Sequence, residues 1–134
     1  RDVERSRGLG DVYKRQRHEG ASLVLEQAKK LSENLPIIVT GDFNAVPSDE
    51  PIQVLINPSD PRHLTHSRTI AGFTYGPKWT FHDFGKIPYD KREWIDYIFV
   101  KGNIKVLRHG VLTETLNNLF PSDHCPVIST LILE

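Results

Sequence analysis

The chain has 134 residues, a length that suits one ordinary domain, and its 38% hydrophobic and 25% charged residues exclude a disordered or fibrous protein. Its 17 basic and 17 acidic residues cancel, which excludes a polybasic arm for nucleic acid or a membrane surface. A single cysteine excludes a disulfide framework and a multi-cysteine zinc site. No methionine is present, which indicates a processed chain or a fragment.

Residues 1–17 differ in composition from the rest of the chain. They hold six basic and three acidic residues without apolar periodicity, and they lack the apolar centre of a secretory signal. The run Gly10-Asp11-Val12-Tyr13-Lys14-Arg15-Gln16 resembles a translated sequencing adapter, with a genuine basic arm as the alternative. We expect residues 1–17 to be non-native or disordered. Residues 18–134, with a net charge of −3, then form the domain.

The regular pattern begins with an amphipathic helix. Its apolar stripe runs at helical spacing from Ala21 to Leu31, and Pro36 blocks its continuation. Residues 37–39 are β-branched and predict a strand buried on both faces. A second short helix is expected near Pro51, capped by Ser48 or Asp49, and its buried residues would be Ile52, Leu55 and Ile56.

The rest of the chain predicts a β-rich half. Residues 57–77 are rich in Pro, Ser, Thr, His and Gly, which is typical of a long surface loop. Strands are expected at residues 79–81, 94–100, 104–107, 111–115 and 127–133. Helix and buried strand together define an α/β fold in a single domain. With only one long helix, the sheet faces would not be fully covered.

Three short motifs carry residues suited to chemistry, and the first follows the predicted buried strand. In Thr40-Gly41-Asp42-Phe43-Asn44-Ala45, the carboxylate of Asp42 can orient or deprotonate water, and the amide of Asn44 can donate to developing negative charge. The carboxyl end of a buried strand is where α/β folds place ligands. An Asx-type turn that only caps the strand is the structural alternative.

The second and third motifs supply an acid and an imidazole. Asp96 stands alone in the apolar run 94–100 and needs a histidine, a metal ion or backbone donors if it is buried; otherwise it faces water. Ser122-Asp123-His124-Cys125-Pro126 precedes the last strand, and Asp96 is the natural carboxylate to set the protonation of His124. A structural turn is the alternative for this motif, and Cys125 is expected to be a packed hydrophobe.

Together the motifs resemble the C-terminal half of the endonuclease/exonuclease/phosphatase superfamily, which includes apurinic endonucleases, DNase I-like nucleases, deadenylases, sphingomyelinases and inositol polyphosphate phosphatases. The matching residues are Gly41-Asp42-Phe43-Asn44, Thr80-Phe81, Ile95-Asp96-Tyr97 and Ser122-Asp123-His124. The resemblance covers roughly residues 21–134. It implies the C-terminal half of a four-layer α/β sandwich, with two mainly antiparallel β-sheets flanked by helices.

The resemblance also implies a reaction and its residues. Members hydrolyse phosphate esters with Mg²⁺ or Mn²⁺. By motif position, Asp42 would activate the attacking water and Asn44 would help to hold it. Asp96 would fix and charge His124, which contacts the scissile phosphoryl group. Asp123 would lie on the metal side, and Asp42 is also expected near the metal.

The superfamily uses an N-terminal half of comparable size that carries the main metal ligand, and nothing here matches it. We therefore expect a fragment that is inactive and poorly stable alone, whose partner is the N-terminal half of the same domain, in a monomer. Many members carry a basic residue where Trp94 stands. Trp94 could pack or stack on substrate, and Lys91 and Arg92 in the preceding loop could bind a phosphorylated ligand, although a solvated turn is the alternative.

Two other functions compete with a phosphoesterase. The first is a non-catalytic binding module with the same fold, against which the intact Asp42, Asn44, Asp96 and His124 count. The second is a transition-metal site, whose candidate ligands lack a recognised spacing: His63, His66 and His82. The net negative charge argues mildly against tight binding of duplex DNA. The sequence indicates no localisation.

Overall fold

The computed structural model describes residues 2–134 and contains two three-stranded sheets. The helices are α1 (Asp2–Ser32), α2 (Glu50–Ile56) and α3 (Ser67–Ile70), with a 3₁₀ turn η1 at Tyr89–Lys91. The strands are β1 (Ile37–Asp42), β2 (Thr65–His66), β3 (Phe73–Tyr75), β4 (Asp96–Lys101), β5 (Ile104–Val111) and β6 (Val127–Leu133). None of the described helices is long and apolar enough to cross a membrane.

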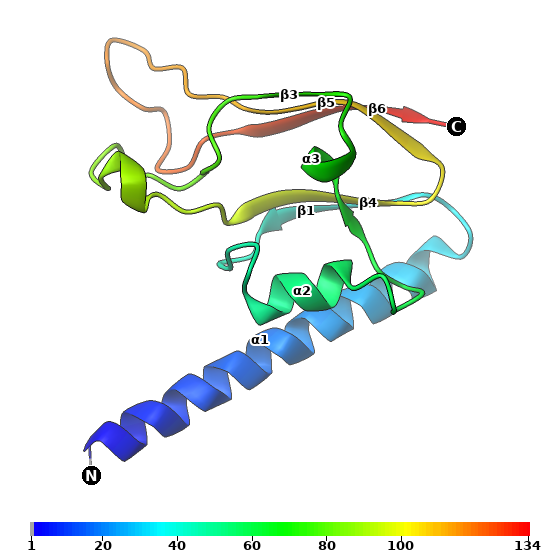
Figure 1. Ribbon diagram of the computed structural model, residues 1–134, viewed down its shortest axis with the longest axis horizontal. Coiled ribbons are helices and arrows are strands. Elements are labelled where there is room, and N and C mark those ends of the chain that lie inside the picture. Colours follow the sequence, from blue (N-terminus) through cyan, green and yellow to red (C-terminus); the bar gives the residue numbers. More distant parts are fainter. Residues whose placement is uncertain (1) are drawn as a thin grey trace.

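The elements form layers. The sheet β3-β5-β6 lies face to face with the sheet β1-β4-β2, and α1 and α2 lie against the other side of the latter (Figure 1). All strand pairs are antiparallel except β3 with β5. This confirms the predicted α/β fold with two mainly antiparallel sheets flanked by helices.

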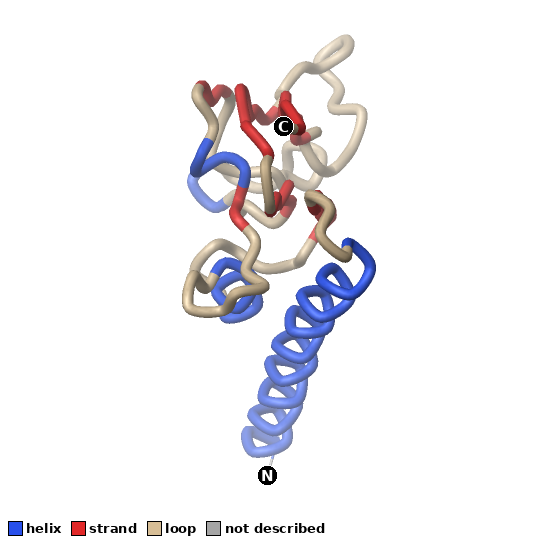
Figure 2. The backbone as a smooth tube through the Cα atoms, turned by 90° about the vertical axis from the view of Figure 1, so that its right-hand side faces the viewer, coloured by secondary structure: helices blue, strands red, loops and turns tan. Residues whose placement is uncertain are grey.

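Helix α1 is longer than the periodicity predicts. It begins at Asp2 rather than near Ala21, and its N-terminal part extends beyond the rest of the molecule (Figure 2). Ala21 and Leu25 are buried, whereas Leu31 at the end of the predicted stripe is 78% exposed. Residues 2–17 therefore lie in a helix, with the side chains of residues 12–17 exposed. That residues 1–17 are non-native stays a prediction.

Strand β1 forms as predicted, but its predicted burial on both faces is wrong. Successive side chains of a strand point to opposite faces. Ile37 and Val39 pack against the core, while Ile38 between them is 47% exposed. Helix α2 forms where expected and buries Ile52 and Leu55, and Ile56 is half-buried.

Three further predictions are corrected. Residues 57–77 are not one long loop, because they contain β2, α3 and β3, elements too short to show a periodic pattern. Residues 79–81 form no strand, although Phe81 makes single bridges to Glu93 and His124. The strand expected at 104–107 continues through an irregularity between Val106 and Arg108 and ends at Val111 as the single strand β5, and residues 112–115, expected in a further strand, form none.

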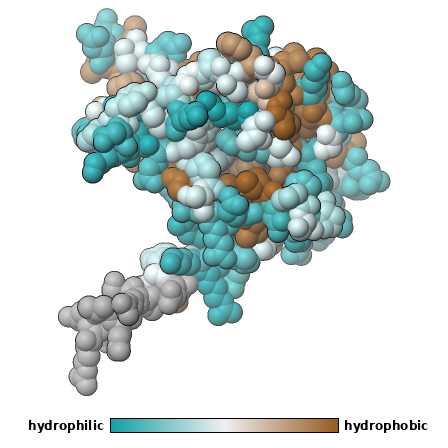
Figure 3. Space-filling model, viewed as in Figure 1, coloured by the Kyte–Doolittle hydropathy of each residue, from teal (hydrophilic) through white to brown (hydrophobic). Residues whose placement is uncertain are grey.

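The core lies between the helices and the sheets. Its largest fully buried side chains include Tyr97, Phe99 and Leu25. Apolar side chains also reach the surface near the sheet β3-β5-β6 (Figure 3), where Phe73 is 61% and Ile132 is 44% exposed. This agrees with the expectation that one long helix leaves the sheet faces incompletely covered.

Candidate active site

Strand pairing brings the first two motifs together. Strand β1 runs antiparallel to β4, and the last residue of β1, Asp42, pairs directly with the first residue of β4, Asp96. The bond from the Phe43 N–H to the Ile95 carbonyl, at 2.9 Å, extends this pairing past the strand ends. Two carboxylates far apart in the sequence therefore meet at one end of the sheet.

The turn after β1 fixes the orientation of Asp42. Asn44 has a φ of 48°, in the left-handed region that asparagine tolerates better than most residues. Its N–H donates to the Asp42 Oδ1 at 2.8 Å, which is the Asx-type turn named as the structural alternative. The turn uses only one carboxylate oxygen, so the structural and the catalytic interpretations of Asp42 are compatible. The Asn44 residue is exposed.

His124 lies between the two carboxylates. Its Nδ1 is 2.8 Å from the Asp96 Oδ2, and its Nε2 is 3.9 Å from the Asp42 Oδ2. Its own N–H donates to the Ser122 Oγ at 3.1 Å, and its ring packs on Phe81 at a centroid distance of 4.9 Å. The alternative in which Asp96 only faces water is excluded, because its side chain is 19% exposed and bonded to His124.

The environment favours the charged form of this imidazole. Burial by itself lowers the pKa of His124. The hydrogen bond with Asp96 and the negative charges of Asp96 and two further aspartates outweigh burial, so the net pKa of His124 is raised above its ordinary value. A histidine whose charged form is favoured in this way can stabilise an anion such as a phosphoryl group.

A cleft of about 400 Å³ opens at this end of the sheet, lined among others by Asp42, Asp96 and Tyr97 and, from the segment after His124, by Cys125 and Pro126. Cys125 is otherwise buried, as expected for a packed hydrophobe. The cleft therefore provides a concave surface beside both carboxylates.

Several buried groups hold the backbone of Asp96. The Thr80 Oγ1 accepts from the N–H groups of Ile95 and Asp96, and the Trp94 Nε1–H donates to the Asp96 carbonyl at 2.7 Å. The Tyr97 hydroxyl bonds the carbonyls of Ala45 and Trp94. Neither Thr80 nor Tyr97 has a role predicted from its residue type. Only their presence in the Thr80-Phe81 and Ile95-Asp96-Tyr97 matches pointed to them.

The residues expected to bind substrate divide into two groups. Trp94 is only 6% exposed and lies between Arg68, whose guanidinium is 4.8 Å from its ring centroid, and His109, on which it stacks. Trp94 is therefore a packing residue in this structure rather than an exposed stacking platform. Arg92 is half-buried and stacks on Trp79, while Lys91 is exposed in η1. Neither belongs to the Asp42, Asp96 and His124 cluster.

Some of the residues predicted at the active site are close enough to one another to hold a metal ion together. Single ligand atoms of Asp42, Asp96 and His124 lie within 4.8 Å of one another. Because Asp96 and His124 are bonded to each other, the exposed carboxylate of Asp42 is the group freest to hold an ion, and hard cations prefer such oxygen ligands. Asp123 lies outside this cluster, and its Oδ1 accepts from the Ser122 hydroxyl at 3.3 Å.

The three histidines of the transition-metal hypothesis occupy different environments. The His63 Nδ1 contacts the Asp60 carbonyl, His66 packs beside Trp94 and Tyr97, and His82 packs between Trp79 and Phe120. Among the described residues, only one group of three or more His, Cys, Asp or Glu side chains is placed to hold a metal ion, and it consists of Asp42, Asp96 and His124. The histidine hypothesis is therefore wrong.

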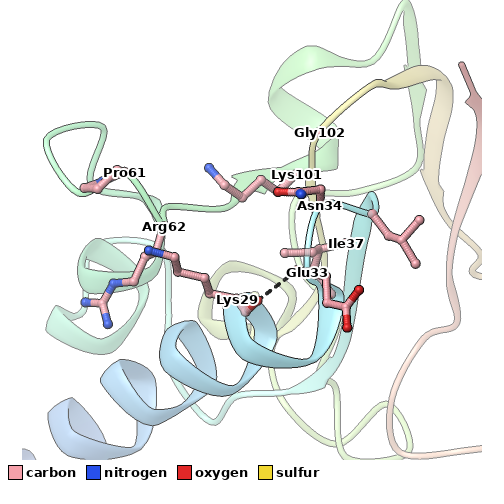
Figure 4. A pocket seen from close by; sticks show the side chains of 10 residues that line it. Lys29, Glu33, Asn34, Ile37, Pro61, Arg62, Lys101 and Gly102 are labelled. Carbon is pink, nitrogen blue, oxygen red and sulfur yellow. Dashed lines mark hydrogen bonds between the residues drawn. The ribbon is translucent and has the colours of Figure 1, made fainter.

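Another cleft, of about 250 Å³, lies at the opposite end of β1 (Figure 4). Its lining includes Lys29, Arg62 and Lys101. Arg62 makes two side-chain bonds to Asp60, and the Lys101 Nζ donates to the His63 carbonyl, so local partners account for two of the three cations. A six-residue strand is about 17 Å long, which separates this cleft from His124.

The two sheets, the outer helices and the carboxylate–imidazole cluster at one end define a class of α/β sandwich proteins. The model of the endonuclease/exonuclease/phosphatase family matches residues 5–124. The chain belongs to this family.

Solved structures agree with this assignment. An endonuclease/exonuclease/phosphatase from Bacteroides vulgatus is 30% identical, with a TM-score of 0.82 over 90% of this chain and 45% of its own. A family member from Bacteroides thetaiotaomicron is 33% identical, with a TM-score of 0.77 over 88% of this chain and 46% of its own. A mannosyl-6-phosphatase from Bacteroides thetaiotaomicron is 33% identical, with a TM-score of 0.75 over 87% of this chain and 45% of its own.

The chain thus spans less than half the length of the solved structures that it matches. A comparison with curated proteins found no significant match.

Proposed function

We propose that the whole protein is a divalent-metal-dependent phosphoesterase to which this chain contributes Asp42, Asn44, Asp96 and His124. The observation that carries the proposal is the position of His124, bonded at Nδ1 to Asp96 and facing Asp42 from Nε2. Structural turns alone do not require an imidazole between two carboxylates. This arrangement also argues against a non-catalytic binding module.

The residues divide the chemistry of phosphate ester hydrolysis between them. Asp42, exposed beside the cleft, orients the attacking water and accepts its proton. The amide of Asn44 donates to the negative charge that develops. Asp96 holds the proton at the His124 Nδ1, which leaves the Nε2–H of the imidazolium to donate to a phosphoryl oxygen.

The ion proposed for this site is Mg²⁺ or Mn²⁺. Asp42 would hold it, with Asp123 as a second candidate, and when bound it would neutralise charge on the phosphoryl oxygens. This chain supplies few oxygen ligands, whereas Mg²⁺ takes six. We therefore expect activity to need more of the protein than these 134 residues.

A phosphorylated sugar is the first substrate to test. The support is the 33% identity to a structure named as a mannosyl-6-phosphatase. Phosphodiesters remain in the proposal, because the cluster of Asp42, Asp96 and His124 acts on the phosphoryl group and not on what it is attached to.

The test uses the natural full-length protein with Mg²⁺ and a panel of a hexose 6-phosphate, a generic aryl phosphomonoester and an aryl phosphodiester. Asp42→Asn and His124→Ala should each lower kcat by at least about 100-fold on the preferred substrate. His63→Ala and Asp90→Asn are matched controls outside the cluster and should leave kcat unchanged. Unchanged hydrolysis in the first two variants would refute the catalytic roles of Asp42 and His124, and a wild-type protein without hydrolysis would favour the binding module instead.

A further inference from the structure

Thr80 is bonded to both segments that carry the acid–imidazole pair. Its Oγ1 accepts from the N–H of Ile95 at 3.0 Å and of Asp96 at 3.2 Å. Its carbonyl accepts from the N–H of Cys125, the neighbour of His124, at 2.7 Å. Its own N–H donates to the Glu93 carbonyl at 2.9 Å. The residue is fully buried, so water does not compete for these bonds.

We propose that Thr80 is a positioning residue that sets the distance between the Asp96 carboxylate and the His124 imidazole. Asp96 is the first residue of β4, and the residues between η1 and Asp96 belong to no named strand. His124 lies in a loop before β6. The pairing of β1 with β4 fixes Asp96 against Asp42, whereas the His124 loop is placed by its bridge to Phe81, the neighbour of Thr80. Thr80 is bonded both to the segment that carries Asp96 and to the segment that carries His124, close to the point where these two side chains meet.

The side-chain oxygen and the backbone of Thr80 have separable roles. The backbone bonds to Cys125 and Glu93 are independent of the side chain, whereas the side-chain Oγ1 is the acceptor for the N–H groups of Ile95 and Asp96. Valine has the shape of threonine without the oxygen, and would leave both N–H groups without their acceptor. Serine keeps the oxygen and loses the methyl group. Comparison of the valine and serine variants therefore distinguishes a role of the Thr80 hydrogen bonds from a role of its side-chain volume.

The experiment compares Thr80→Val and Thr80→Ser in the natural full-length protein. The first readout is the proton NMR signal of the His124 Nδ1–H, which lies downfield while the imidazole is bonded to Asp96. The second readout is whether the substitution changes kcat or KM of phosphate ester hydrolysis, and this readout rests on the proposed function. Ser67→Ala is the matched control, because it removes another fully buried hydroxyl, whose partner is Ser129 at 3.1 Å.

Thr80→Val should move the Nδ1–H signal upfield and lower kcat about 10- to 100-fold with little change in KM, since small misplacements of catalytic groups have effects of that size. Thr80→Ser and Ser67→Ala should retain the wild-type signal and most of kcat. A wild-type signal in folded Thr80→Val, an equal shift in Thr80→Ser, or an equal shift in Ser67→Ala overturns the proposal.

If Thr80→Val does not fold, Thr80→Cys, with a weakly accepting sulfur, is judged by the same criteria. The NMR signal does not depend on turnover. A wild-type protein without phosphoesterase activity would therefore contradict the proposed function, while the positioning role would still be decided.

Discussion

The Asp96 Oδ2 lies 2.8 Å from the His124 Nδ1, although the two residues are 28 positions apart in the chain. Asp96 belongs to the sheet β1-β4-β2, and His124 precedes β6 of the other sheet. The contact therefore joins the two layers of the sandwich at the end where the cleft opens. Its chemical consequence is a raised His124 pKa, which can be tested by removing the Asp96 charge.

Asp96→Asn keeps the shape of the side chain and removes its negative charge. Part of what raises the pKa of His124 is lost, so the imidazole should deprotonate at lower pH than in the wild-type protein. In the natural full-length enzyme, kcat should fall at least about tenfold, and the alkaline limb of the pH–rate profile should move to lower pH. Asp90→Asn, in the exposed turn η1, should leave the profile in place. An unmoved alkaline limb in Asp96→Asn would contradict the role given to this pair.

Removal of divalent metal should abolish hydrolysis by the full-length protein, and Mg²⁺ or Mn²⁺ should restore it. Asp42→Asn should weaken Mn²⁺ binding at least roughly tenfold, because an amide is a poorer ligand than a carboxylate for a hard cation. Electron paramagnetic resonance of free Mn²⁺ measures this binding without any turnover. Full activity after exhaustive chelation would refute metal dependence, and unchanged Mn²⁺ binding would remove Asp42 from the ligands.

Two buried histidines predict a loss of stability in acid. The pKa values of His66 and His109 are each lowered to about 4, mainly by burial, with further lowering by the charge of Arg68. Unfolding returns each toward its ordinary pKa of 6.5. Between pH 6.5 and 4 the unfolded state therefore binds more protons, and the free energy of unfolding falls as the pH falls. Urea unfolding at pH 7 and pH 5 measures the difference.

His109→Gln should flatten this dependence, because it removes one of the histidines whose pKa is lowered in the folded protein. His63→Gln, at a histidine outside the buried pair, is the control and should keep the wild-type slope. A slope that is the same in His109→Gln as in the wild type would show that other groups cause the acid sensitivity.

Trp94 should act on stability and not on substrate affinity. It is buried against Arg68 and His109, and its Nε1–H holds the Asp96 carbonyl. Trp94→Ala should lower the free energy of unfolding by about 3–5 kcal/mol, as large buried aromatics do. Trp94→Phe should cost less and leave KM close to the wild-type value. A large rise in KM in a stable Trp94→Phe protein would instead restore the expected contact with substrate.

Local patterns were sufficient for the longer elements. Helix α2 and strands β1, β4 and β6 lie close to their predicted positions, because apolar periodicity and β-branched density act over a few adjacent residues. The two-residue strand β2 and the short α3 were missed inside a polar segment, since elements of that length carry no period. Strands β2 and β3 form because β4 and β5 offer edges to pair with, and a linear sequence does not show such edges.

The sequence by itself determined the family. Asp42, Asn44, Asp96 and His124 were identified by residue type and motif order, and these patterns are local. Only the tertiary structure decided which groups meet. It joined Asp96 to His124, buried Trp94 that had been expected at the substrate, and left Asp123 outside the cluster. The physical reason is that strand register and the buried bonds of residues such as Thr80 set distances between segments, and these depend on packing across the whole fold.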